Sequence, residues 1–335
     1  EIYQCDWSSD VCSSDLGSNA IVANIVPDKR GPAPAYEDIV PSEPSIQETN
    51  GRRGAVQTFE DLLTSPNDEK LFEYYCTSQI AMIDLGGKIK KIGEPAIISN
   101  FDFSPDGKYL MVSTIHRPFS YQFPLNRFPV KTEIWDASGK MVASVYDAPL
   151  QDAQPVGGVQ TGPRSFGWIP TENATLMWVE ALDGGDPRKK VTPRDRLMTL
   201  AAPFNGQAAE LLKIENRYQG RQFGEKQGFM LFVDYDRDKQ RRRIFTTDYR
   251  DPSKAKMISD LNVNDRYNDP GQPVTKMLPS GANVIRQDGD AIFMTGNGSS
   301  PEGDRPFLRR LDLSTLKTDE IFRSSNTEYE SVVAL

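Results

Sequence analysis

Three arginines near a proline-rich loop are the residues of this chain best suited to recognise a ligand. Arg117 and Arg127 border a segment rich in Pro and aromatic residues that joins two strand-like runs, and Arg164 opens a later strand-like run. A planar guanidinium can bind a carboxylate through two parallel hydrogen bonds, so these three side chains are candidates for binding substrate. The alternative is that they tie the loop to neighbouring strands, and the sequence leaves both roles open.

The single histidine, His116, lies at the end of a strand-like run and is followed closely by Pro118. A serine nucleophile needs a base within hydrogen-bonding reach and two donors for the oxyanion. The G-x-S-x-G pattern of a hydrolase nucleophile elbow does not occur in the sequence. We therefore predict that His116 is structural and that this chain contributes no catalytic residue.

Two further motifs suggest sites, but each has a simpler structural interpretation. Residues 183–186, DGGD, lack the ligand spacing of a calcium loop, and we expect a tight turn in which Gly supplies positive φ. Residues 236–243, DRDKQRRR, mix acids with bases and predict a solvated hairpin, not a nucleic-acid site. We find no zinc pattern and no phosphate-binding Gly loop, and we predict no metal, no cofactor and no nucleic-acid partner.

The composition is that of a globular protein. Of the 335 residues, 38% are hydrophobic and 26% charged, which argues against disorder. No run approaches the roughly 18 apolar residues of a membrane-spanning helix, so no membrane span is predicted. A length of 335 residues leaves room for one large domain or two small ones.

The first sixteen residues differ from the rest. They are rich in Ser, Asp and Cys, contain no Lys or Arg, and resemble translated sequencing-adaptor DNA, so we predict that 1–16 is a non-native leader. Without this segment the acids fall from 47 to 43 against 39 bases, and the net charge moves from −8 to −4. Cys76 is then the single cysteine, which excludes an internal disulfide and is compatible with cytosol, periplasm or plastid.

The remaining chain begins with a proline-rich stretch, residues 17–56, which predicts an extended loop. Cap residues followed by acids then predict two short helices between about 58 and 76. From residue 79 onward, short apolar runs alternate with Gly or Asp turns and predict strands in hairpins.

These hairpins recur as a loose repeat. Phe101, Phe166, Phe223 and Met277 mark successive repeats, and we expect each to lie in a buried strand. Two hairpins per repeat make a four-stranded unit, which predicts an all-β fold, a partial β-propeller of four to five blades over residues 57–335. The alternative is a β-sandwich, which usually lacks so long a repeat.

Several segments resemble the glutamyl endopeptidase group of the prolyl oligopeptidase family of serine peptidases. The most specific are HRPFS (116–120) followed by RFP (127–129) and EIWD (133–136), and the pattern W-x-E-x-x-DGGD (178–186). The similarity spans about residue 25 to the end. In that family a seven-bladed propeller covers an α/β-hydrolase domain that carries a Ser–Asp–His triad.

The resemblance implies a serine peptidase with preference for Glu, in which this chain is a non-catalytic propeller portion that gates access to a downstream hydrolase domain. The expected partners are a peptide substrate and the protein's own α/β-hydrolase domain. The alternative is a non-catalytic propeller that binds a protein on one face. A nucleophile elbow downstream of Leu335 would favour the peptidase, and a stop codon shortly after the last blade would favour the binding module.

Overall fold

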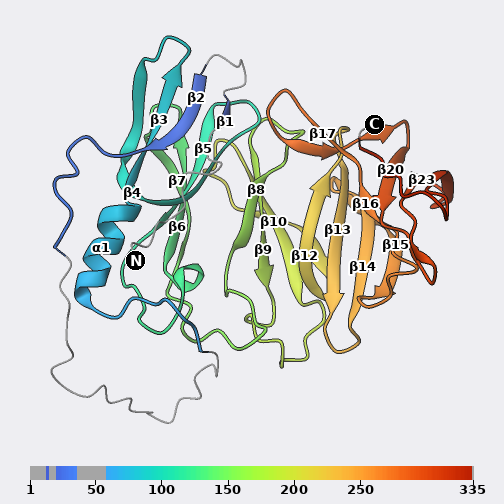
Figure 1. Cartoon of the computed structure of the whole chain (residues 1–335). Helices are drawn as coiled ribbons and strands as arrows, with labels where there is room; N and C mark the ends of the chain where they lie inside the picture. The colour runs from blue at the N-terminus through green and yellow to red at the C-terminus, as the bar shows by residue number, and fades with distance from the viewer. Residues whose placement is uncertain (1–12, 15–19, 36–57, 334–335) are drawn as a thin grey trace. The chain divides into compact units, whose positions relative to one another are not determined.

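The computed structural model of the chain describes residues 13–14, 20–35 and 58–333. The chain divides into two compact units, the first comprising residues 1–164, 183–190 and 202–205 and the second the remainder. Nearly all regular structure in both units is antiparallel β-sheet (Figure 1). The all-β prediction is therefore confirmed.

The first unit contains a sheet of seven strands in chain order, β1 to β7. The first half of the long strand β4 pairs with β3 and its second half with β5, so that β4 belongs to two successive four-stranded groups. The strands are β1 (Ser13–Ser14), β2 (Ala20–Ile25), β3 (Ser78–Asp84), β4 (Ile89–Phe103), β5 (Tyr109–Ile115), β6 (Val130–Asp136) and β7 (Met141–Ala148).

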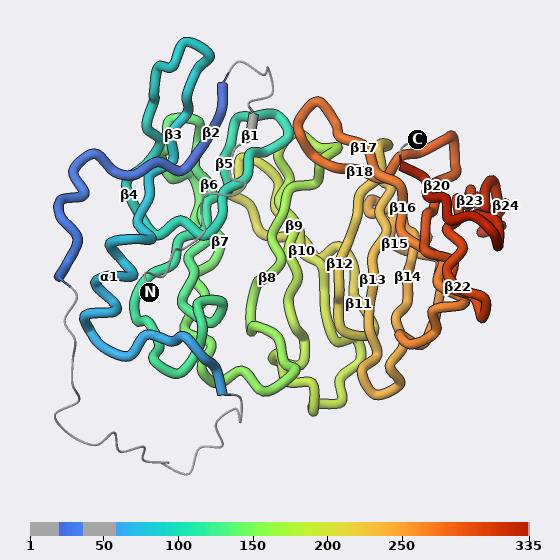
Figure 2. Tube along the Cα trace, viewed as in Figure 1, coloured from blue at the N-terminus to red at the C-terminus, as the bar shows by residue number. Residues whose placement is uncertain are grey.

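The second unit contains three further sheets, two of four strands and one of five (Figure 2). Two small hairpins, β17–β18 and β21–β22, accompany the last sheet. The first two sheets comprise β8 (Arg164–Trp168), β9 (Thr175–Ala181), β10 (Asp195–Ala201) and β11 (Ala209–Ile214), and then β12 (Arg217–Phe223), β13 (Phe229–Asp236), β14 (Arg241–Asp248) and β15 (Asp251–Asn262). The last sheet and the hairpins comprise β16 (Gln272–Pro273), β17 (Thr275–Met277), β18 (Asn283–Ile285), β19 (Gln287–Asp288), β20 (Ala291–Gly296), β21 (Ser299–Ser300), β22 (Gly303–Asp304), β23 (Phe307–Asp312) and β24 (Thr318–Arg323).

The three sheets of the second unit pack face to face through apolar side chains. In the second unit, Met177 and Val179 of β9 join Met230 and Phe232 of β13 in one buried cluster. Leu231 points to the other face of β13 and packs with side chains of the last sheet, including Ile292 of β20. The β12–β15 sheet is thus buried on both faces by its neighbours, which is how propeller blades remove their apolar residues from water.

The first unit repeats this packing within its own strands. Ile80 and Ile92 belong to the β3–β4 half and Leu110, Val112 and Trp135 to the β4–β7 half, and all five lie in one cluster. The four-stranded groups predicted from the sequence are confirmed as blade-like sheets, four of them complete and one further group at the start.

Three local expectations are corrected. Residues 58–64 form no helix, because Asp61 has a φ of +55° and Pro66 begins the following helix, α1 (Pro66–Cys76). Met277 is 69% exposed, because β17 is a three-residue strand outside the main sheet. Residues 20–25, expected to be loop, form β2 and pair with β3; residues 36–56 of the expected loop, like most of the predicted leader, lie outside the described residues.

A buried ion pair links two stacked sheets of the second unit. Asp195 of β10 is fully buried and accepts hydrogen bonds from Nη1 of Arg217 at 2.6 Å and from the backbone N–H of Tyr218 at 2.7 Å, both from β12. The Arg217 side chain is 13% exposed. Two charges buried in this way must stay paired, because either one alone would lack its solvation.

We predict that Asp195→Asn lowers the free energy of unfolding by about 3 to 5 kcal/mol, the usual cost of removing one partner from a buried pair. Urea unfolding followed by circular dichroism measures the change. The matched control is Asp251→Asn, whose pair with Lys254 is largely exposed and should matter little. Equal effects of the two substitutions would contradict the structural role of Asp195.

Candidate functional site

Helix α1 forms the support for the candidate site. Ser65 caps its N-terminus: the Ser65 hydroxyl accepts a hydrogen bond from the Asp68 N–H at 3.1 Å, and the Asp68 carboxylate accepts one from the Ser65 N–H at 3.0 Å. Pro66 occupies the first turn, where its missing N–H costs nothing. This capping box fixes where the helix begins and hence where Glu69 and Glu73, one turn apart, are placed.

The loop of residues 116–129, between β5 and β6, will be called the arginine loop. Two of its aromatic residues, Phe119 and Phe128, are buried and stack at a centroid distance of 5.4 Å. Phe72 of α1 meets both rings edge-on, at 5.0 and 5.8 Å. The backbone N–H of His116 donates to the Pro129 carbonyl at 3.1 Å and closes the base of the loop. The loop is therefore packed onto α1 and is held at both ends.

Arg117 is occupied by carboxylates of α1. Its Nε and Nη2 donate to the two carboxylate oxygens of Glu73, at 2.7 and 3.0 Å, and its Nη1 donates to Glu69. These hydrogen bonds, with Glu73 the larger contributor, raise the pKa of Arg117 above its ordinary value. A substrate carboxylate would have to displace them, so the contacts of Arg117 agree with the tethering alternative.

Arg127 keeps more of its donors available. It ends a short 3-10 turn, η1 (Leu125–Arg127), and its Nη1 donates to the Gln151 carbonyl at 3.2 Å, while its own carbonyl accepts from the Gln151 N–H at 2.9 Å. Its guanidinium lies 5.8 Å from the ring centre of Phe123. Among the described residues no hydrogen-bonding partner is found for Nε or Nη2, so two donor nitrogens are available to a ligand.

The remaining candidates lie in different surroundings. Arg164 is the half-buried first residue of β8, so the structure places it in a separate element from the arginine loop. His116 approaches the Asp147 carboxylate through Nε2 at 2.8 Å and the Arg117 carbonyl through Nδ1 at 2.6 Å. Contacts of both ring nitrogens with the chain itself agree with the structural role predicted for His116.

Sequence reasoning did not identify Glu69 and Glu73 as partners of Arg117. Glu69 was expected among the acids of a first helical turn, where an acid interacts favourably with the helix dipole, and Glu73 was given no role. Their spacing of four residues does place both carboxylates on one helix face, which is the signal for a shared cation. That this cation is Arg117, more than 40 residues later in the sequence, depends on tertiary packing.

The turn prediction for residues 183–186 is confirmed. Gly184 and Gly185 have φ of +68° and +77°, and the Gly185 N–H donates to the Asp183 carboxylate at 2.9 Å. A Cβ on Gly185 would lie 2.1 Å from the carbonyl oxygen of Val159, so the turn also requires Gly for close packing. Across the described residues no group of three or more His, Cys, Asp or Glu could hold a metal ion.

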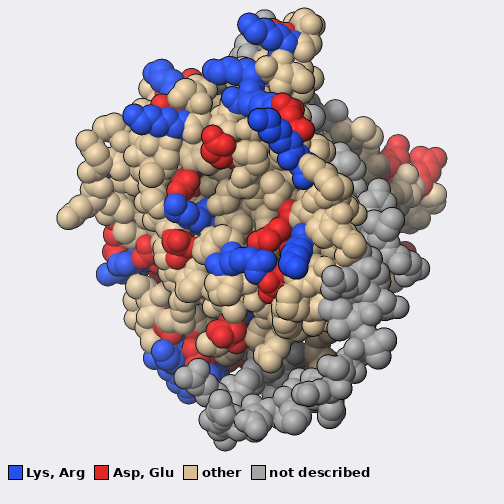
Figure 3. All heavy atoms as spheres, turned by 90° about the vertical axis from the view of Figure 1, so that its left-hand side faces the viewer, with Lys and Arg blue, Asp and Glu red and all other residues tan. Residues whose placement is uncertain are grey.

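Charges on the face around α1 are mixed. Figure 3 shows Lys and Arg in small groups among Asp and Glu, without an extended surface of one sign on the face in view. No helix in the part of the chain that the structure describes is long and apolar enough to cross a membrane.

Packed four-stranded antiparallel sheets define a protein of the propeller class. Comparison with known proteins shows which propeller proteins it is similar to. The chain is 38% identical over 333 residues to a protein of Oryza sativa subsp. japonica named probable glutamyl endopeptidase, chloroplastic, and 33% identical to the Arabidopsis thaliana protein of the same name. Each match covers 96% of this chain. The resemblance to glutamyl endopeptidases seen in the motifs is thereby confirmed: over nearly its whole length, this chain is similar to two proteins of that name.

The chain spans about a third of the length of these relatives, 35% and 34%. Among solved structures, the β-propeller domain of the Trilobed protease from Pyrococcus furiosus aligns with 93% of this chain and 70% of its own, at 10% identity and a TM-score of 0.44. No protein-family model matches the chain.

We predict that Arg117→Met and Glu73→Gln each increase hydrogen exchange in α1 and the arginine loop, because either change breaks the paired hydrogen bonds between Arg117 and Glu73. In a double-mutant cycle the second substitution should add little to the first, since both remove one interaction. Hydrogen exchange followed by mass spectrometry measures this. As a control, Arg188→Met breaks a pair inside its own turn, with Asp186, and should leave α1 unchanged. Fully additive effects of Arg117→Met and Glu73→Gln would contradict a direct interaction between these two side chains.

Proposed function

We propose that this chain is the propeller portion of a serine peptidase that hydrolyses peptide bonds with preference for Glu. In this proposal the propeller limits access to a hydrolase domain elsewhere in the same protein. The observation that carries the proposal is the 38% identity, over nearly the whole chain, to a protein named as a glutamyl endopeptidase. The sequence itself has one histidine and no nucleophile elbow, which is consistent with catalysis by another part of the protein.

The gating role is supported by the packing of the sheets. Sheets buried on both faces are stiff, because interiors are close-packed and resist deformation. A cover of this kind admits extended peptides more easily than folded domains. It supplies selectivity by size without contributing a reacting group.

Among the three candidate arginines, we propose that Arg127 makes the substrate contact. Arg117 is already held by Glu69 and Glu73, whereas Arg127 uses one donor for the Gln151 carbonyl. The guanidinium also lies over the neighbouring Phe123 ring, 5.8 Å from its centre. The guanidinium could bind a glutamate side chain of an incoming peptide through the N–H groups of Nε and Nη2.

The function is tested on the product of the complete open reading frame. A fluorophosphonate probe, which reacts with activated serines, should label that product and leave residues 17–335 alone unlabelled. The complete product should also cleave an unstructured Glu-containing peptide and leave a folded protein with the same internal sequence intact. Absence of both labelling and cleavage would remove the peptidase proposal and favour a binding module.

We predict that Arg127→Met in the complete protein lowers kcat/KM for a Glu-containing peptide about tenfold and leaves the matched Gln peptide nearly unchanged, because a charge-assisted hydrogen bond is lost for one of them. Arg117→Met and Arg164→Met serve as comparisons that share the charge change. An equal loss on both peptides would assign Arg127 a structural role.

A further inference from the structure

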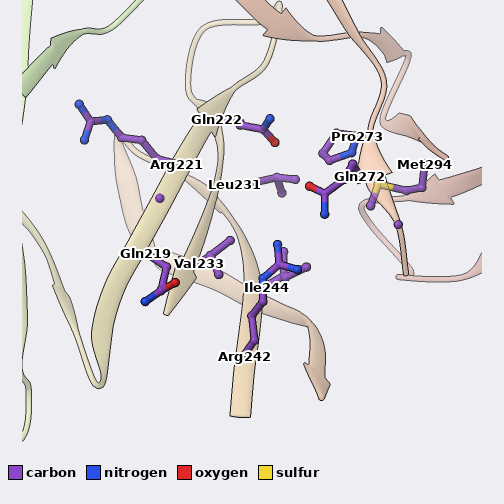
Figure 4. Close-up of a pocket in the computed structure, with 12 residues that line it drawn as sticks. Gln219, Arg221, Gln222, Leu231, Val233, Arg242, Ile244, Gln272, Pro273 and Met294 are labelled. Carbon is purple, nitrogen blue, oxygen red and sulfur yellow. The ribbon is translucent and has the colours of Figure 1, made fainter. Parts of the chain in front are cut away.

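A cavity of about 370 Å³ lies in the second unit, between the β12–β15 sheet and strands β16 and β20 of the last sheet (Figure 4). Its size is within the roughly 300 to 1,000 Å³ of small-ligand sites. All the described residues that line the cavity belong to the second unit, whereas the arginine loop belongs to the first.

One side of the cavity is apolar. Leu231, Ile244 and Met294 are buried and line it together with Val233. Leu231 and Met294 are also part of the cluster that holds the two sheets together, so this wall is fixed by the core.

The polar side chains of the cavity are available to a ligand. Gln219 and Gln222 come from β12 and Gln272 from β16; all three are exposed, and no side-chain hydrogen bond to another described residue is found for them. In Figure 4 the side chains of Gln222 and Gln272 extend toward one another on either side of Leu231. Amides with free donors and acceptors suit a ligand that offers both, as a peptide backbone does.

Arg242 supplies the charge. Its neighbours in β14 are paired, Arg241 with Asp260 at 2.6 Å and Arg243 with Asp234 at 2.6 Å. Side chains alternate along a strand, so Arg242 points to the opposite face, into the cavity. It is half-buried, and no acceptor for its guanidinium is found among the described residues. A guanidinium in this situation favours an anionic partner.

None of the described residues that line the cavity is acidic, so none neutralises this charge. A second guanidinium, that of Arg221, also lines it, but its Nη atoms donate to the carbonyls of Ser165 and Met177 at 3.1 and 3.2 Å. Figure 4 shows the Arg221 side chain directed away from the other lining residues. Arg242 is therefore the group placed to meet a carboxylate.

The backbone around the cavity also suits an extended chain. Strands β12 and β16 are each the end strand of their sheet, and end strands present backbone donors and acceptors that a peptide can use. We propose that this cavity binds a short extended peptide segment in which a carboxylate side chain stands beside an apolar one, with Arg242 binding the carboxylate and the Leu231 wall receiving the apolar group. The inference concerns binding by this chain's own residues and holds whether or not the protein is a peptidase.

The test is a binding titration with the full chain, followed by fluorescence anisotropy. The probes are a fluorescein-labelled Ala-Leu-Glu-Leu-Ala peptide, capped at its C-terminus as an amide, and the same peptide with Gln in place of Glu. The Glu peptide should bind about tenfold more tightly than the Gln peptide, because its charge-assisted bond to Arg242 is stronger than a neutral one. Equal affinities would overturn the proposal.

The matched variants are Arg242→Met and Arg237→Met. Arg242→Met should reduce affinity for the Glu peptide about tenfold and leave the Gln peptide unchanged. Arg237→Met makes the same charge change at an exposed turn of the same sheet and should alter neither. A folded Arg242→Met protein that retains wild-type affinity for the Glu peptide would overturn the proposal.

If Arg242→Met does not fold, a second variant tests whether the peptide binds in this cavity. Gln272 is exposed, so Gln272→Glu should be tolerated, and it places a negative charge in the cavity. Its affinity for the Glu peptide should fall more than its affinity for the Gln peptide. Unchanged affinity for the Glu peptide would count against the cavity as the binding site.

Discussion

The face-to-face burial of each four-stranded sheet is the constraint on which this structure depends. A small twisted sheet with apolar residues on both faces cannot remove them from water alone, and it must pack against a neighbour on each side. In the second unit β13 shows this directly, with Met230 facing one neighbouring sheet and Leu231 the other. The buried pair of Asp195 and Arg217 adds a directional tie between two of these sheets.

The positions suited to binding follow from this packing. The arginine loop leaves the sheet between β5 and β6 and is held by aromatic contacts with α1, so Arg127 is presented by a supported loop. The cavity near Arg242 is lined by the end strands β12 and β16 of two stacked sheets, together with Leu231 and Met294 of the core cluster that holds these sheets together. In both cases packed side chains support an arginine, Arg127 or Arg242, whose guanidinium has N–H groups without a partner among the described residues.

Much of this fold could be predicted from the sequence, because alternation and turn residues are local signals. The hairpins and their four-stranded grouping followed from them, and Phe101 and Phe223 are buried as expected. The predictions were wrong or incomplete where contacts between residues distant in the sequence determine the structure. Met277 is apolar but lies in a short hairpin outside the core, and the occupation of Arg117 by Glu69 and Glu73 depends on a helix more than 40 residues away. The Arg242 cavity was missed because three consecutive arginines read as one solvated run, although strand alternation sends the middle one to the other face.

The packing of sheet on sheet can be observed directly in solution. With methyl groups of Met and Val labelled, nuclear Overhauser contacts report which side chains lie against one another. We predict contacts that connect Met177 or Val179 of β9 with Met230 of β13, since all three are buried in one cluster. If these methyl groups show contacts within their own sheets and none between the sheets, the stacked arrangement is contradicted.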